Sequence, residues 1–152
     1  MTPRECGPCT ACCHGLVVEA IDKPAFVDCP HTAADGGCGR YADRPSACRN
    51  FQCLWLQGHL GTADRPDQLG VIFTTTHHET LGTHPLLVEV TPGAASAAKV
   101  RAAVGELNRR TPVLVAAAGG GTFYPRQTSG LSKPERVDTT PTVRLTVEGR
   151  AA

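Results

Sequence analysis

Every cysteine of this chain lies between positions 6 and 53, and four of them fall in the run Cys6-x2-Cys9-x2-Cys12-Cys13. A free cysteine packs mostly as a small hydrophobe, which gives no reason for such bunching. Metal chelation does, because two residues between ligands let a tight turn direct both sulfurs at one ion. The sequence therefore predicts a metal-binding segment whose ligands are Cys6, Cys9, Cys12, Cys13, Cys29, Cys38, Cys48 and Cys53.

Eight thiolates match two closed zinc sites of four ligands each, or one cluster of ions that share bridging sulfurs. Because side chains of adjacent residues diverge, we expect Cys12 and Cys13 to serve different ions. Thiolates accept iron as well as zinc, and the run opens like a bacterial ferredoxin motif, although its fourth cysteine comes too early. The prediction is two zinc ions, with iron or an iron–sulfur cluster as the alternative.

Disulfide bonding is the other use for eight cysteines. Residues 1–20 contain no apolar segment typical of a secretory signal, and no apolar run is long enough to span a bilayer. These features predict a cytoplasmic location, where thiols stay reduced and this cysteine pattern indicates metal binding. The adjacent pair Cys12 and Cys13 could not form an ordinary bridge without strain.

Charge limits the choice of partner. Residues 1–58, which we call the cysteine module, carry five basic side chains against six acidic ones. Nucleic-acid binding requires a basic face, and this module has none, so the prediction is a structural role or a surface for another protein. Arg44 and Arg49 flank Cys48 and are expected either to offset thiolate charge or to pair with Asp43 at the surface.

The elements that must position these ligands are short. Turns are expected over residues 6–13 and a short strand over residues 16–21. Pro45 suits the first turn of a helix that runs to Gln57 and stops at Gly58. Along such a helix Phe51 and Trp55 would share an apolar face, and we expect them to bury against the second half of the chain.

The remainder predicts an α+β fold, in which the cysteine module precedes a compact β-β-α-β unit over residues 59–121. Residues 71–76, 86–90 and 112–116 have strand composition, with a turn predicted at 82–85. Apolar residues repeat every three or four positions between 93 and 110, which predicts a helix. Gly119-Gly120-Gly121 is expected to end the third strand as a flexible turn, and residues 122–152 to form a flexible tail or an edge strand around 143–147.

No catalytic constellation is found, so the sequence does not support an enzyme. His14 and His31 follow cysteines closely and could replace a thiolate, yet eight cysteines already complete two sites. The pair His77-His78, with His84 nearby, is expected to face solvent rather than to perform acid–base chemistry. The glycine run is not a phosphate-binding loop, because no Lys-Ser/Thr follows it.

Two blocks of this sequence resemble the CxxCxxCC family of zinc- or iron-chelating proteins. The first is Cys6-x2-Cys9-x2-Cys12-Cys13. The second is Cys38-Gly-Arg40-Tyr-Ala-Asp-Arg-Pro-Ser-Ala-Cys48-Arg-Asn-Phe-Gln-Cys53, which is similar to that family's C-x-[IV]-Y-x-x-R-P-x-x-C-R-x-F-x-C segment, with Arg40 in place of an aliphatic residue. The resemblance covers the first third of the chain and implies metal chelation by the eight cysteines. Some members look like a segment of flagellin lysine methylases, so a role beside a modifying enzyme is a further expectation.

Overall fold

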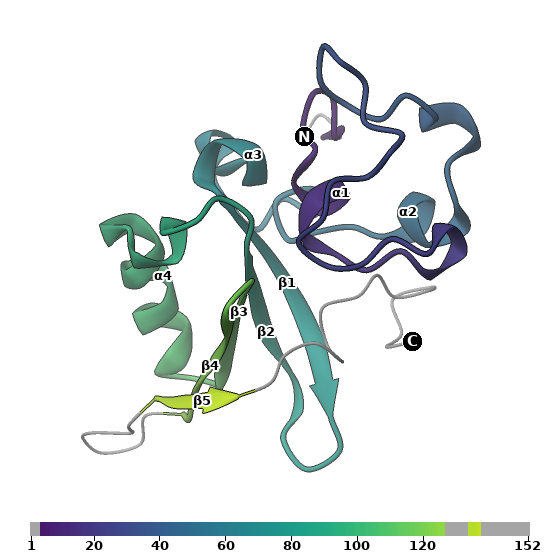
Figure 1. The fold of residues 1–152 in the computed structure, drawn as a ribbon. Helices are drawn as coiled ribbons and strands as arrows, with labels where there is room; N and C mark the ends of the chain where they lie inside the picture. Colours follow the sequence, from purple (N-terminus) through teal and green to yellow (C-terminus); the bar gives the residue numbers. More distant parts are fainter. Residues whose placement is uncertain (1–3, 127–133, 138–152) are drawn as a thin grey trace.

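The computed structural model describes residues 4–126 and 134–137. Three layers follow one another in space: the cysteine module, a five-stranded sheet, and the helix α4 (Ala98–Asn108) on the far side of the sheet (Figure 1). The predicted α+β class is confirmed. Among the described residues, none of the helices combines the length and the apolar character needed to cross a membrane.

The sheet extends the predicted β-β-α-β order by two strands. Neighbours follow chain order, and all pairs are antiparallel except β2 with β3, which are parallel and joined through α4. A parallel pair needs such a crossover because its strands run the same way. The strands are β1 (Val71–His78), β2 (Gly82–Glu89), β3 (Val113–Ala117), β4 (Gly120–Tyr124) and β5 (Glu135–Val137).

The predicted turn at 82–85 is wrong, because β2 already begins at Gly82 and pairs with β1 along its whole length. Pro85 sits inside this strand opposite Thr75. Proline cannot donate to a strand ladder and is confined to places without a partner on one side. That condition is met here, because β3 pairs with β2 only from Leu86 onward.

The glycine run 119–121 is also different from its prediction. Gly119 lies in the turn, but Gly120 and Gly121 begin β4 and pair with Ala117 and Ala116. Gly120 has φ +122°, and a Cβ there would lie 2.9 Å from the Arg136 guanidinium. Only glycine admits that backbone and that neighbour. β4 and β5 thus take part of the predicted tail into the sheet, while residues 143–147 lie outside the described residues.

The helix predicted over residues 93–110 is confirmed in its main part. A short 3-10 turn η4 (Ala94–Ser96) precedes it, and the regular helix α4 begins one residue after the extended Ala97. At its other end the buried Asn108 donates its amide to the carbonyls of Thr111, Tyr124 and Pro125. The end of α4 is thereby tied to β4. Two short elements, η3 (Thr62–Asp64) and α3 (Pro66–Leu69), connect the module to β1.

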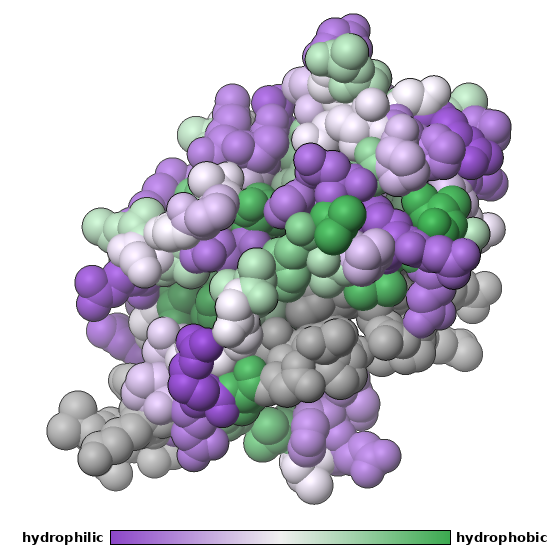
Figure 2. Space-filling model, viewed as in Figure 1, coloured by the Kyte–Doolittle hydropathy of each residue, from purple (hydrophilic) through white to green (hydrophobic). Residues whose placement is uncertain are grey.

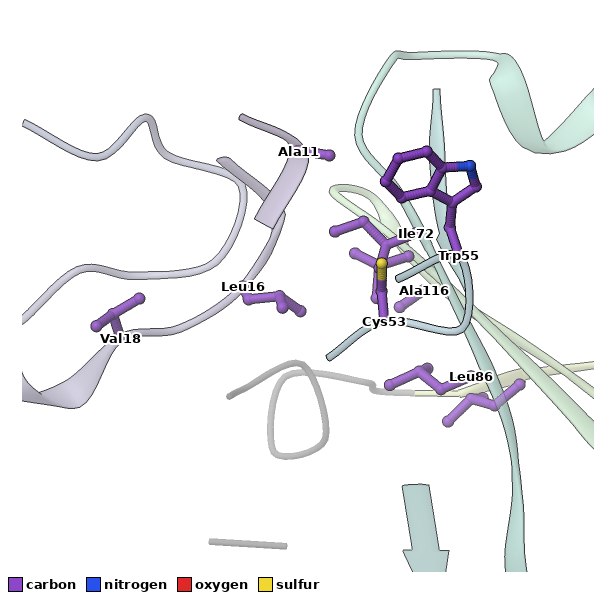
Figure 3. Close-up of a cluster of buried hydrophobic side chains, with 10 residues drawn as sticks. Ala11, Leu16, Val18, Cys53, Trp55, Ile72, Leu86 and Ala116 are labelled. Carbon is purple, nitrogen blue, oxygen red and sulfur yellow. The ribbon is translucent and has the colours of Figure 1, made fainter. Parts of the chain in front are cut away.

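Each face of the sheet buries its own apolar cluster. Towards α4 the cluster contains Val71, Phe73, Leu87, Val100, Val104, Val113 and Val115. Towards the module, Ile72, Leu86, Val88, Leu114 and Ala116 of the sheet meet Ala11, Leu16, Val18, Cys53 and Trp55 (Figure 3). The alternation of residues 71, 72 and 73 between the two clusters follows from the strand period of two.

Within the module, regular structure is limited to single turns. The helices are α1 (Ala11–Gly15) and α2 (Ser46–Asn50), and the 3-10 turns are η1 (Glu19–Ile21) and η2 (Tyr41–Asp43). Residues 6–13 therefore contain a helix start as well as the predicted turns. In place of the predicted strand at 16–21, Val18 makes an isolated antiparallel bridge with Lys23 across η1.

The helix predicted from Pro45 to Gln57 is too long. Its last intrahelical bond runs from Phe51 N–H to Ala47 O, after which the backbone is extended. Leu54 N–H donates instead to Phe73 O of β1, at 2.8 Å. Leu54 consequently packs into the cluster under α4, whereas Trp55 is buried on the opposite face of the sheet. The expected burial of Trp55 against the second half is confirmed, but a shared helical face is not its cause.

Candidate metal centre

All eight cysteines line one cavity of about 70 Å³. They reach it from five separate stretches of sequence: the opening run with α1, the two loop positions 29 and 38, α2, and the segment after α2. None of the eight is in a disulfide. A single water has a share of about 30 Å³ in the liquid, so the cavity is larger than one small ion requires.

The thiols surround this cavity without converging on one point. In residues 4–126 and 134–137, no three Cys, His, Asp or Glu side chains are placed closely enough to hold an ion. The donor set itself fits thiophilic metals, because eight soft ligands face a common space whose other walls are mainly apolar. The side chains would have to move toward one another around a bound ion.

Close packing places α1 against the sheet and with it Cys12 and Cys13. At the end of α1, a Cβ on Gly15 would lie 2.8 Å from Val90 Cγ1 and 3.1 Å from Val88 Cγ1. Any larger side chain would therefore push the helix off the strand. Leu16 follows at 1% exposure and anchors the chain in the cluster beneath the module. The cysteine pair is thus held at a rigid layer of the fold.

Backbone hydrogen bonds bring the loop cysteines to the same place. Cys29 N–H donates to Cys13 O at 3.0 Å, and Thr32 N–H donates to Cys29 O at 3.1 Å. Thr32 in turn forms an antiparallel bridge with Cys38. Cys13, Cys29 and Cys38 are therefore connected in one ladder of short contacts, although 25 positions separate the first from the last.

Backbone amides point at three of the sulfurs. Each of these cysteines accepts an N–H group from the residue two positions later: Cys9 from Ala11, Cys53 from Trp55, and Cys29 from His31, the last at 3.4 Å. Hydrogen bonds to sulfur favour the thiolate over the thiol. This repeated arrangement suits cysteines that act as anionic ligands.

Burial opposes ionisation of most of these thiols. It raises the pKa of Cys6, Cys48 and Cys53, and that of Cys9 to about 11. Cys53 is the most enclosed, with 6% exposure, and lies beside Ile72 and Ala116 in Figure 3. Without a cation in the cavity, these buried sulfurs are neutral at pH 7. Binding of a divalent cation would replace those protons.

The adjacent pair behaves differently. A hydrogen bond from the Cys12 thiol lowers the pKa of Cys13 to about 7, and Lys23 contributes in the same direction. That same bond, together with burial, raises the pKa of Cys12 well above its ordinary value. In the ion-free protein, Cys13 is thus about half ionised at pH 7, and the Cys12 thiol donates to its thiolate form.

Electrostatic neighbours favour a grouping of the thiols into two sets, although the strongest influence on Cys12 comes from Cys13 of the other set. The pKa of Cys48, raised first by burial, is raised further by Cys13, Cys29 and Cys38. On the other side, Cys6 is influenced by Cys53, and Cys12 by Cys6 and Cys9. The two sets adjoin, because Cys13 also acts on Cys6 and Cys12. They are Cys6, Cys9, Cys12, Cys53 and Cys13, Cys29, Cys38, Cys48.

Several cations lie near the thiols, and among them Arg44 and Lys23 each interact with more than one cysteine. Arg44 lines the cavity, lowers the pKa of Cys6 and Cys48, and stacks on Tyr41 with 3.8 Å between its guanidinium carbon and the ring centroid. Its Nε is buried and has no hydrogen-bond partner among the residues that the structure describes. Arg49 instead donates to Arg44 O at the surface, and Asp43 pairs with Arg40, so the expected pairing of Asp43 with Arg44 or Arg49 is not seen among the described residues.

Lys23 is the second cation, and the sequence analysis missed it. Its side chain is buried at 3% exposure beside Cys13 and Cys29. Lys-Pro following an aspartate reads as an exposed turn, so no local signal distinguishes this lysine. Only the folding of α1 against the following loop encloses it.

The histidines separate into cavity and surface groups. His31 lines the cavity, with its Nε2 3.4 Å from Arg40 Nη1, whereas His14 turns outward to Asp28 at 2.8 Å. At the far end of the β1–β2 hairpin, His77 and His78 are exposed. His84 is buried instead, at 4% exposure, and packs edge-on against Phe123, so the expectation of solvent exposure fails for this residue.

The outer face of the module is mixed in character. Figure 2 shows polar residues over much of its rim, with hydrophobic residues reaching the surface around α1 and the neighbouring loops. Val27 and Tyr41 are exposed at 49% and 45%. Comparison of the chain with protein-family models, with curated proteins and with solved structures found no match.

Proposed function

We propose that this protein binds metal through its eight cysteines, with zinc as the ion and a structural or partner-presenting role for the module. One observation carries the proposal: five stretches of sequence bring all eight free thiols to a single cavity. Hydrophobic packing does not explain it, because seven of these thiols are only partly buried. The amides directed at the sulfurs of Cys9, Cys29 and Cys53 support thiolate ligation.

The two sets of thiols support an assignment to two ions. One ion would be held by Cys6, Cys9, Cys12 and Cys53. The other would be held by Cys13, Cys29, Cys38 and Cys48. Four thiolates form a common closed zinc site, which contributes to folding and leaves no open position for a substrate. The resemblance to the CxxCxxCC family supports the same ligands without deciding between zinc and iron.

An iron–sulfur cluster is the second candidate, and the closeness of the two sets of thiols is compatible with it. The Cys12 and Cys13 sulfurs share a hydrogen bond, so the two sets of thiols adjoin within one undivided cavity. Such an arrangement suits ions connected by bridging sulfur as well as two separate sites. A redox or electron-transfer role would follow, because clusters of this kind exchange electrons.

Elemental analysis of protein purified without oxygen tests the proposal. We expect a colourless protein with two zinc ions per chain. A brown protein that contains iron and acid-labile sulfide would replace zinc by the cluster. Protein that is folded and free of metal, or whose thiols are joined in disulfides, would contradict metal binding altogether.

Paired substitutions test the assignment to two ions. Cys6→Ser with Cys9→Ser removes two ligands from the first set, and Cys29→Ser with Cys38→Ser removes two from the second. Each double variant is the control for the other, and each is expected to retain one zinc per chain. Complete loss of metal from both variants would indicate one shared cluster instead.

A further inference from the structure

Lys23 is a lysine in a place where lysines are rarely found. It is 3% exposed, and only two other polar residues of the described chain, His84 and Asn108, are as well buried. A buried ammonium is costly unless it is paired. No carboxylate forms a salt bridge with it among the described residues, because Asp28 pairs with His14 at the surface.

Its three donors all find backbone carbonyls. Lys23 Nζ lies 3.1 Å from His14 O, 2.7 Å from Pro24 O and 2.7 Å from Val27 O. His14 directly follows Cys13 in α1, and Val27 stands two positions before Cys29. The ammonium thus connects the two backbone segments that carry these cysteines.

The main chain of Lys23 strengthens the same connection. Its N–H and C=O groups exchange two hydrogen bonds with Val18, at 3.0 and 2.9 Å. Val18 is buried in the cluster beneath the module. The hydrogen bond from Cys29 N–H to Cys13 O joins the same two segments directly. Together, these hydrogen bonds around Lys23 place Cys13 and Cys29 beside each other.

Carbonyl dipoles satisfy the hydrogen bonds of an ammonium but do not neutralise its charge. The groups near it that could do so are the thiols of Cys29 and Cys13, in their ionised form, and the carboxylate of Asp28, which is already paired with His14. A divalent ion with four thiolates carries a formal charge of about −2. One ammonium beside it would halve that charge.

We propose that Lys23 is a positioning residue of the second metal site, where it fixes Cys13 and Cys29 and offsets part of the thiolate charge. This inference rests on the proposed function. The carbonyls that accept from Lys23 belong to His14, Pro24 and Val27, in the segments that carry Cys13 and Cys29. A defect at Lys23 should therefore act mainly on the second of the two ions. Partners outside the ligand shell commonly change metal affinity by roughly 10- to 100-fold.

The test uses Co²⁺ as the probe, added to the reduced, metal-free full chain. The number of Co²⁺ ions bound per chain and the thiolate-to-cobalt charge-transfer absorption measure how many sites are filled and by which ligands. Circular dichroism measures whether the fold is retained. Lys23→Met removes both charge and donors. Lys99→Met is the matched control, because Lys99 is an exposed lysine on α4 that pairs with Asp64. Lys23→Gln is a second variant, which keeps donors but no charge.

We expect two ions in the unmodified chain and in Lys99→Met. Lys23→Met and Lys23→Gln should bind one ion as before and the second roughly 10- to 100-fold more weakly. The proposal would be overturned if both sites of Lys23→Met kept their affinity for Co²⁺. It would also be overturned if both sites weakened equally in Lys23→Met and Lys23→Gln and circular dichroism showed a changed fold. Unchanged binding by Lys23→Gln would overturn the charge offset. Absence of Co²⁺ binding by the unmodified chain would refute the proposed function itself, and this inference with it.

Discussion

Under α4, the sheet is held by apolar side chains such as Val71, Leu87 and Val113, each with 0% exposure. On the opposite face, the cysteine module places Leu16, Val18 and Trp55 against the sheet, but its outer half is built from single helical turns and loops around thiols. Strand ladders and a continuous core make the first region self-sufficient. The second has few buried apolar side chains of its own, and under the proposed function bound ions would complete it.

The two regions also differ in how much of their regular structure is stable without outside support. Helices of five residues are not stable alone, because nucleating a helix is unfavourable. Packing of Gly15 and Leu16 on the sheet holds one end of the module. The loops that carry Cys29 and Cys38, and the short helix α2 that carries Cys48, lie beyond that contact and are where bound ions would contribute most.

Removal of metal should give the largest difference between the two regions. With a strong chelator under reducing conditions, amide hydrogens of residues 6–53 are expected to exchange rapidly, because a structural zinc contributes on the order of 10–16 kcal/mol of apparent binding energy to folding. Strands β1, β2 and β3 should keep their protection. Hydrogen exchange with mass spectrometry measures both regions in one experiment. Unchanged exchange in the module after chelation would show that the module does not depend on metal for its folding.

A substitution in the cluster under α4 should instead destabilise the sheet whether or not metal is bound. Leu87→Ala deletes a fully buried side chain beneath α4 and should lower the free energy of unfolding by about 2–5 kcal/mol. The loss should be nearly equal in the metal-loaded and metal-free protein, because Leu87 lies in the cluster under α4, to which the module contributes Leu54 but none of its cysteines. Denaturant titration measures it.

The matched control for that substitution is Leu81→Ala. Leu81 lies in the β1–β2 turn at 44% exposure, so its loss should change stability by less than about 0.5 kcal/mol. A metal-dependent effect of Leu87→Ala would show that the two regions are not independent in their stability.

Thiol reactivity gives a smaller and more local test, which reads the arrangement of the thiols in the fraction of metal-free protein whose module is folded. In the metal-free protein Cys13, with its pKa lowered to about 7, is half ionised at pH 7, whereas Cys9, raised to about 11, is almost entirely protonated. Only the thiolate reacts, but lower basicity reduces its nucleophilicity, so we expect Cys13 to react roughly 100-fold faster. Alkylation at Cys13 should increase as the pH rises through about 7.

Peptide mapping after brief iodoacetamide treatment measures this order. Bound metal should protect both residues, so the metal-loaded protein is the control. In Cys12→Ala the hydrogen bond from the Cys12 thiol is lost, and the midpoint for Cys13 should move to higher pH, because that bond is the largest of the effects that lower its pKa. Faster reaction at Cys9 than at Cys13 would contradict the arrangement of the pair.

Much of the fold follows from local patterns along the chain. Alternation and β-branched composition locate β1, the second half of β2 and β3, and the repeat of apolar residues locates α4. These signals work because strand and helix periods are properties of neighbouring residues. β4 carries no such signal, since a strand beginning Gly120-Gly121 forms only beside Ala117 and the side chain of Arg136.

The amino-acid sequence by itself determined that the cysteines gather in one N-terminal segment and that an α+β unit follows it. Tertiary structure alone decided which sulfurs are neighbours and where α2 ends. Leu54 N–H bonds to Phe73 O instead of continuing the helix, and Lys23 is enclosed by carbonyls of two segments. Both outcomes depend on contacts between residues far apart in the chain, which spacing along the sequence does not encode.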